Sequence, residues 1–262
     1  MAESSLVELV LRRERLLVAA GLALVVAGSW GYLLAGAGMQ HEMGGMLMPM
    51  SSGPWTAGQA LVVGVMWVAM MAAMMLPSAT PMVLFHAAIA RQRGGESARA
   101  GAASGAFVLG YLAVWSLFSI GATALQYALE RLALLSPMME TTSIVLAGAI
   151  LVAAGVYQWT PFKRACLQHC QSPLAFVMAH WRDGTAGSFA MGVRHGSFCL
   201  GCCWLLMLLL FIGGVMNVAW IAGIAVFVAV EKFVPAGHWV SRAAGALLVV
   251  WGLATWWSAA RG

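Results

Sequence analysis

Residues 191–207 read MGVRHGSFCLGCCWLLM and lead directly into a further apolar run. Five residues of this stretch recur at every fourth position: Met191, His195, Cys199, Cys203 and Met207. Side chains at this spacing lie above one another on one face of an α-helix. If the stretch is a membrane helix, that face carries thioether, imidazole and thiol groups, which are ligands for soft or borderline metal ions.

The composition of the whole chain supports a membrane location. Of its 262 residues, 62% are hydrophobic and only 9% are charged, whereas soluble domains carry about 25% charged residues. The apolar residues form long runs, which predicts one integral membrane domain over residues 1–262 and no sizeable soluble domain. The net charge of +5 comes from basic residues in short loops, as membrane topology produces, and we expect no nucleic-acid partner.

The apolar runs predict an all-α bundle of about seven transmembrane helices. The expected helices cover residues 16–36, 56–90, 102–129, 143–159, 187–215, 218–234 and 239–258. Most Lys and Arg residues fall in loops on the same side as the N-terminus, which predicts an N-in, C-out protein of the bacterial inner membrane. Residues 39–52 are then an external loop and residues 160–185 a cytoplasmic loop. A cleaved signal peptide ending near Ala37 is the alternative, but the first apolar run is longer than a signal sequence needs.

The external loop is dense in metal donors. They include Met39, His41, Met43 and Met46. Thioethers bind Cu(I), and imidazole also accepts Cu(II), so the loop is a candidate for metal capture. The alternative is an apolar loop that lies at the membrane interface without any ligand.

The second helix carries a row of further donors. They are Met70, Met74, Met82 and His86. Pro77 and Pro81 interrupt the same helix and each removes a backbone donor, which is tolerated where the backbone faces protein or a wet cavity. Methionine is also a good filler of apolar gaps, so ordinary packing explains any single one of these residues. The set as a whole favours a thioether path.

The loop at 160–185 contains a second candidate site. Spacings of three and four place Cys166, His169 and Cys170 on one face of a helical turn, and two thiolates with an imidazole suit Cu(I) or Zn(II). The alternative is a pair of unpaired thiols beside a surface histidine. The chain has five cysteines, and none falls in a segment predicted to be external, which indicates reduced thiols rather than disulfides.

The fifth helix gives the strongest signal, since His195, Cys199, Cys202 and Cys203 lie within three turns. A lone cysteine in such a helix is usually a small apolar residue, but three with a histidine form a candidate metal site. Arg194 would favour the thiolate form or offset the charge of a thiolate-bound metal.

Two adjacent charges close the sixth helix, Glu231 and Lys232. Glu231 has Arg194 and Arg242 as candidate partners, or it accepts a proton. The alternative is a pair that extends from the membrane towards the cytoplasmic interface.

Four blocks of sequence resemble a known family. They are YQWTPFKRACLQHCQSP at 157–173, CLGCCW at 199–204, MAAMMLP at 71–77 and EK at 231–232. Together they resemble a bacterial family of predicted metal-binding integral membrane proteins, catalogued as a domain of unknown function, over roughly residues 60–255. The resemblance implies a metal-binding membrane protein and supplies no substrate or mechanism.

We therefore expect a protein that binds and moves or delivers a soft metal, with Cu(I) first and zinc or another soft metal as alternatives. Its expected partners are the lipid bilayer, the metal ion, and a metallochaperone or copper enzyme. Donor softness suggests a relay by ligand exchange from the Met-rich loop. It passes along the methionines of the second helix and the fifth-helix thiols and is received at Cys166, His169 and Cys170. We expect transport or metal handling rather than catalysis. The functions left open are a mercuric or zinc ion transporter, a membrane thiol oxidoreductase, and a haem- or quinone-binding accessory subunit that uses His86 and His195.

Overall fold

The computed structural model describes the backbone of residues 2–36, 40–43, 46–49, 54–94, 97–136 and 139–261. Side chains are described for residues 16–36, 54–93, 100–136 and 139–261. The helices are α1 (Ala2–Leu34), α2 (Ala57–Gly94), α3 (Ser97–Arg131), α4 (Ile144–Tyr157), α5 (Pro161–Gln171), α6 (Pro173–His180), α7 (Gly184–Leu208), α8 (Leu210–Gly213), α9 (Val218–Phe233) and α10 (Gly237–Ala259). Strands β1 (Gln40–Met43) and β2 (Met46–Pro49) pair antiparallel within the Met-rich segment. Apart from this hairpin the elements are helices, and the all-α class is confirmed at that level.

Among the described residues, five or six helices are long and apolar enough to cross a membrane. Within the described ranges, five pass a test of length and apolar composition: Leu16–Leu34, Ala57–Arg93, Ala100–Arg131, Gly184–Gly213 and Gly237–Ala259. A sixth crossing is possible if α4 and α5, which meet at a 65° bend, act as one broken span. Helix α9 has 16 residues, or about 24 Å, which is shorter than a hydrocarbon core of about 30 Å. The expected count of seven is not confirmed, and the N-in, C-out orientation stays a prediction.

The segment at 160–185, predicted as a loop, folds largely into the two short helices α5 and α6. Thr160 caps α5 by accepting a hydrogen bond from the amide of Lys163, and Pro161 occupies the first helical turn. Both residues are typical of a helix start. The same pair ends α4, so the sequence Thr160-Pro161 explains why α4 and α5 bend apart instead of forming one straight helix.

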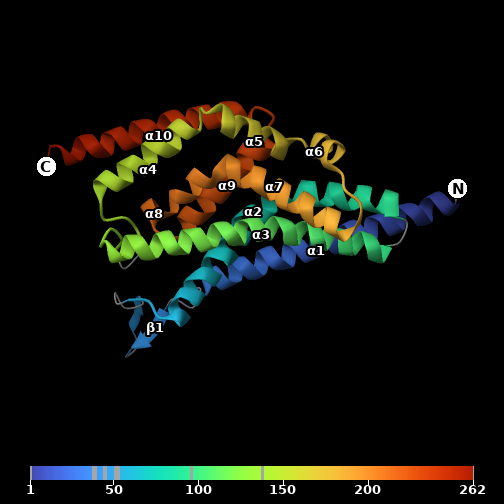
Figure 1. Ribbon diagram of the computed structural model, residues 1–262, viewed down its shortest axis with the longest axis horizontal. Coiled ribbons are helices and arrows are strands. Elements are labelled where there is room, and N and C mark those ends of the chain that lie inside the picture. Colours follow the sequence, from blue (N-terminus) through green and yellow to red (C-terminus); the bar gives the residue numbers. More distant parts are fainter. Residues whose placement is uncertain are drawn as a thin grey trace.

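The helices are arranged around a central group of α2, α3, α7 and α9. Helix α7 packs along α3 and also against α5, while α1 packs on α2. Helices α4 and α10 pair with each other along one side of the molecule, and the hairpin lies at the opposite side (Figure 1). Glycine permits the close packing of α7 on α3 and of α4 on α10. A Cβ at Gly192 would overlap the backbone of Phe107, and one at Gly155 would meet the backbone of Gly245.

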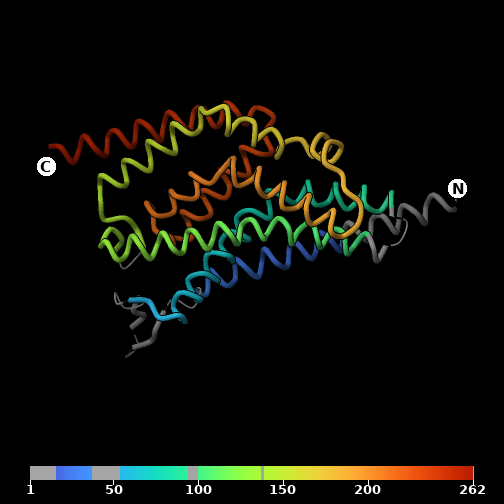
Figure 2. Tube along the Cα trace, viewed as in Figure 1, coloured from blue at the N-terminus to red at the C-terminus, as the bar shows by residue number. Residues whose placement is uncertain are grey.

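Helix α2 changes direction along its length (Figure 2). Pro77 and Pro81 lie within it, and each lacks the amide that would bond to the carbonyl four residues earlier. The hydroxyls of Ser78 and Thr80 donate to the carbonyls of Met75 and Leu76, both at 2.9 Å. The disturbed turn of α2 therefore places several polar groups inside the bundle.

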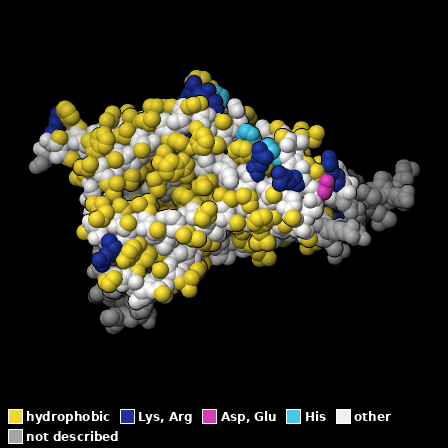
Figure 3. Space-filling view, viewed as in Figure 1, with side chains coloured by type: hydrophobic (Ala, Val, Ile, Leu, Met, Phe, Trp, Pro, Cys, Tyr) yellow, Lys and Arg dark blue, Asp and Glu magenta, His cyan; other side chains and the backbone are white. Residues whose placement is uncertain are grey.

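The surface of the bundle is strongly apolar. Leu24, Leu117 and Leu247 are 73%, 70% and 72% exposed, and apolar side chains cover most of the face in Figure 3. The interior, in contrast, buries charged and polar side chains such as Lys163 and Glu231. An apolar exterior around a partly polar interior is compatible with insertion into a membrane.

The contact between α3 and α7 leads to a stability prediction at Gly110. A Cβ at this position would overlap the carbonyl oxygen of Phe189 and approach the amide nitrogen of Val193 to 2.9 Å. Because both atoms are backbone, they cannot move aside cheaply, and we expect Gly110→Ala to lower the free energy of unfolding by about 1–3 kcal/mol. Thermal unfolding of the purified protein in detergent measures this loss. The matched control is Gly105→Ala on the same helix, where a Cβ meets nothing within 4 Å; equal effects of the two substitutions would contradict the packing argument.

Candidate metal site

Cys199 lies at the point where four helices of the bundle meet. Its Sγ on α7 is 3.0 Å from Nζ of Lys232 on α9 and 3.1 Å from the hydroxyl of Tyr111 on α3. Lys232 also donates to the hydroxyl of Ser78 on α2 at 2.8 Å, and the Tyr111 hydroxyl is 3.2 Å from the carbonyl oxygen of Met75. All of these side chains are buried. An ammonium group and a phenolic hydroxyl therefore converge on one sulfur atom away from water.

The other four thiols lie on α7 and on the neighbouring helix α5. Cys202 and Cys203 each donate to the Cys199 carbonyl at 3.0 Å, as expected three and four residues along a helix. The thiol of Cys170 on α5 lies near enough to Cys199 and Cys202 to interact with both electrostatically. Cys166 packs against Gly201, where a Cβ would come within 2.7 Å of its sulfur. All five are free thiols, and Cys170 is half-buried while the others are buried.

The thiols do not form a closed, preorganised metal site of the zinc type. Across the residues that the structure describes, no three His, Cys, Asp or Glu side chains are grouped so as to hold one ion. A structural zinc site needs four donors arranged tetrahedrally around one point. The arrangement fits an ion that takes only two or three soft ligands at a time.

Methionine adds a thioether to the thiols. The Sδ atom of Met75 on α2 is 4.0 Å from Sγ of Cys203. Met71 and Met82 are spaced by four and seven residues from Met75 and are also buried, so these residues share the helix face that reaches the thiols. The predicted Met70 and Met74 are buried as well. They precede Met71 and Met75 by one residue each, so they lie on a neighbouring face of α2.

Glu231 pairs with a residue that was not among its expected partners. Lys163 Nζ on α5 lies 2.9 and 2.8 Å from the two carboxylate oxygens of Glu231, and both side chains are buried. Ser241 on α10 donates to the same carboxylate at 2.7 Å. The expected pairing of Glu231 with Arg194 or Arg242 is wrong, and Glu231 and Lys232 do not extend to the surface.

His195 and His86 are both buried among aromatic rings. His195 lies 5.7 Å from the ring of Tyr111 and 5.3 Å from that of Phe176. His86 stacks with Trp181 at 5.5 Å. Among the described residues, Nδ1 of His195 and both ring nitrogens of His86 have no hydrogen-bond partner. Buried nitrogens without partners are costly, and they leave lone pairs free for a metal.

Two other predicted residues face away from the thiols. Arg194 is exposed and lines a surface pocket with His180, so Lys232 occupies the position beside Cys199 that Arg194 was expected to fill. His169 stacks on Phe198, with ring centres 4.1 Å apart and planes 12° apart. The structure thus brings Cys166 and Cys170 towards the α7 thiols but turns His169 elsewhere.

The external donors Met39, His41, Met43 and Met46 have side chains outside the described residues. Several residues that complete the site were not predicted: Tyr111, Ser78, Lys163 and the thioether of Met75. In the sequence, Lys163 is one of several basic residues of the segment 160–185, next to Arg164. The available signal was its position three residues before Cys166, on a short helix whose buried face includes both.

The fold and site define an apolar helical bundle with an interior cluster of thiols, a thioether and buried compensating charges, which is a protein that handles a soft metal. A family model described as PpoB2, a copper chaperone, matches residues 64–255. The match covers more than half of the chain, so the chain belongs to this family and handles copper. No curated protein and no solved structure matched. The metal-binding family expected from residues 60–255 is thus confirmed as metal-binding, with copper as the metal of the family.

The buried pair of Lys163 and Glu231 leads to a second stability prediction. Lys163→Met removes the ammonium and leaves the Glu231 carboxylate buried without a countercharge, and breaking a buried pair in this way costs about 3–5 kcal/mol. We expect a large fall in the thermal unfolding temperature and in the yield of monodisperse protein in detergent.

Arg164→Met is the matched control, because Arg164 is the exposed neighbour on the same helix. The double variant Lys163→Met with Glu231→Gln removes both charges and should recover part of the loss. Lys163→Met protein as stable as the Arg164→Met protein would contradict a structural role for the pair.

Proposed function

We propose that this protein is an inner-membrane copper chaperone that holds Cu(I) on the thiols of α5 and α7 and passes it on by ligand exchange. The observation that carries the proposal is the buried cluster of thiols on α7, where Cys202 and Cys203 both contact the Cys199 carbonyl and a thioether lies beside Cys203. Thiolates bind both Cu(I) and zinc, and a thioether among the ligands favours Cu(I). Met75, 4.0 Å from Cys203, supplies a thioether of the same chemical softness.

Ligand exchange needs donors that differ in their access to a partner. Cys170 is half-buried, whereas Cys199, Cys202 and Cys203 are buried. An ion on Cys170 can be reached from outside the bundle, and an ion on Cys199 cannot. Movement between these two ligands would require only that one sulfur bonds to copper as another leaves.

Lys232 supports this function electrostatically. Its Nζ lies 3.0 Å from Sγ of Cys199, and an ammonium at that distance offsets negative charge on the sulfur in a site without water. The ammonium is itself held by Ser78. The apolar helices of the bundle support a location in the bilayer, with the Met-rich segment on the outer side as the candidate capture site.

The thiol cluster is tested by replacing Cys199, Cys202 and Cys203 together with serine. We expect the purified triple variant to lose at least about tenfold in Cu(I) affinity, because serine oxygen is a poor ligand for a soft ion. Competition with a chromophoric Cu(I) chelator under anaerobic conditions measures this affinity, and elemental analysis gives the copper content of protein as purified. Thermal unfolding of both proteins without copper shows whether the fold is kept. Unchanged copper binding in the folded variant would refute the proposal.

The thioether is tested separately by Met75→Leu. Leucine has nearly the same volume and apolar character, so the core should stay packed while the sulfur is removed. We expect Cu(I) affinity to fall by a few-fold up to about tenfold, the effect of losing one soft ligand. Met178→Leu is the matched control, since Met178 is 73% exposed on α6. Equal affinities of the two variants would remove Met75 from the ligand set.

A further inference from the structure

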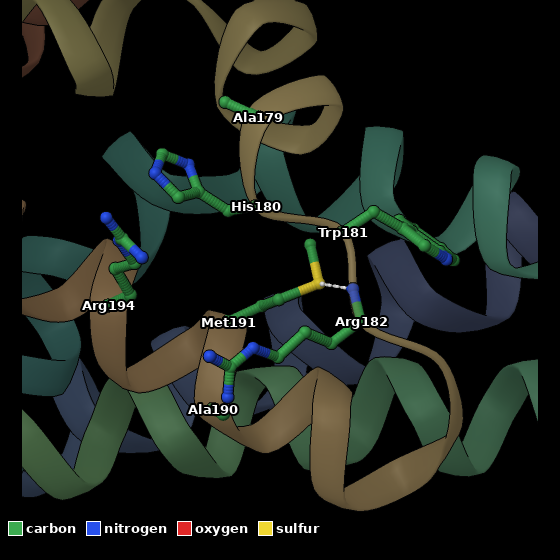
Figure 4. A pocket seen from close by; sticks show the side chains of 7 residues that line it. All are labelled: Ala179, His180, Trp181, Arg182, Ala190, Met191 and Arg194. Carbon is green, nitrogen blue, oxygen red and sulfur yellow. Dashed lines mark hydrogen bonds between the residues drawn. The ribbon is translucent and has the colours of Figure 1, made fainter.

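The structure brings together two histidines, His169 on α5 and His180 on α6, outside the thiol cluster. Their ring centres are 6.3 Å apart with an angle of 46° between the planes. His180 also lines a pocket of about 220 Å³ together with Met191, Arg182 and Arg194 (Figure 4). Histidine and basic side chains gather on the same face of the molecule (Figure 3). The pair is therefore accessible from outside the bundle, unlike His86 and His195.

Both imidazoles are held in the tautomer that suits a metal ligand. Nδ1 of His169 lies 2.8 Å from the carbonyl oxygen of Ala165, and Nδ1 of His180 lies 3.0 Å from that of Phe176. A carbonyl oxygen only accepts, so Nδ1 carries the proton in each neutral ring and the lone pair is left on Nε2. Metal-binding histidines commonly show this bond from the second nitrogen to a backbone carbonyl. Within the described residues, no hydrogen bond engages either Nε2.

The separation of the ring centres is that of two imidazoles whose Nε2 atoms both face one shared ion. A metal about 2 Å from Nε2 lies about 3 Å from the centre of that ring. Two rings that share an ion in a nearly linear arrangement therefore have centres about 6 Å apart, in agreement with 6.3 Å. Nearly linear ligation by two donors is a geometry that Cu(I) accepts and that ions demanding four or six ligands do not.

We propose that His169 and His180 form a second, solvent-accessible Cu(I) site beside the thiol cluster. Arg182 and Arg194 line the adjoining pocket, and their positive charges repel a divalent ion twice as strongly as a monovalent one, which favours Cu(I) over zinc.

The site adjoins the thiols where α5 packs against α7. His169 stacks on Phe198. The next residue along each helix is a cysteine, Cys170 on α5 and Cys199 on α7, and the two helices pack against each other. In this position, His169 and His180 would receive copper from an external carrier protein and pass it to Cys170. The role rests on the proposed function, but the binding site itself does not.

The test is X-ray absorption at the copper edge on full-length protein loaded with Cu(I) from a chromophoric chelator under anaerobic conditions. We expect sulfur scattering at low copper loading and added imidazole scattering at saturation. In the variant His169→Phe with His180→Ala, the imidazole component and about one equivalent of copper should be lost, while the sulfur component stays. Phenylalanine at 169 keeps the ring that stacks on Phe198.

His238→Ala is the matched control, because His238 is an exposed histidine at the start of α10, where its ring lies beside Trp239. Imidazole scattering that is absent from the wild-type protein, or that persists in the double variant, would overturn the histidine site. If the double variant does not fold, His180→Gln alone gives the same readout. Imidazole scattering without any sulfur component would instead leave this site standing and refute the thiol site.

Discussion

Glu231 and Lys232 are adjacent charged residues buried inside an apolar bundle, and each needs polar partners there. Those partners come from other helices, so the two charges hold the helices of the bundle together. A buried charge without a partner costs several kcal/mol. Because neighbouring residues on a helix point about 100° apart, Glu231 and Lys232 reach in different directions from α9. Glu231 meets Lys163 of α5 and Ser241 of α10, while Lys232 meets Ser78 of α2 and Cys199 of α7. A short helix of 16 residues thereby contacts four others through polar atoms.

The features that could be predicted from sequence are the local ones. Apolar runs identify the long helices. The recurrence of donor residues at every fourth position identifies the face of α7 that carries Cys199 and Cys203. The span count is not confirmed, because it depends on helix ends, and α4 ends after 14 residues, before Thr160 and Pro161 begin α5. The partners of the charges could not be predicted, since Lys163 and Glu231 are 68 residues apart. Only the packing of α5 against α7 and α9 decides that they meet.

His169 illustrates how far helical spacing can be taken. At 100° per residue, Cys166 and Cys170 lie about 40° apart around α5, whereas His169 lies about 100° from Cys170. A spacing of three and four residues places the two cysteines and the histidine on one broad face of the helix. It does not direct their side chains to one metal ion. The narrower angle brings both thiols towards the thiols of α7, while His169 reaches a different part of the same helix and stacks on Phe198. His180, which no local pattern connects with His169, becomes its neighbour only because α6 folds back.

The charge balance of the thiol site bears on which ion it suits. A Cu(I) ion on two thiolates has a net charge of minus one, and the ammonium of Lys232 at 3.0 Å from Cys199 brings the group to zero. A divalent ion on the same two thiolates with the same ammonium would leave a positive charge in a low-dielectric interior, which is costly. A third thiolate would restore neutrality for the divalent ion, but it requires three ligands at one point, and the described side chains include no such group. Electrostatics and geometry therefore favour the same monovalent, two-coordinate ion.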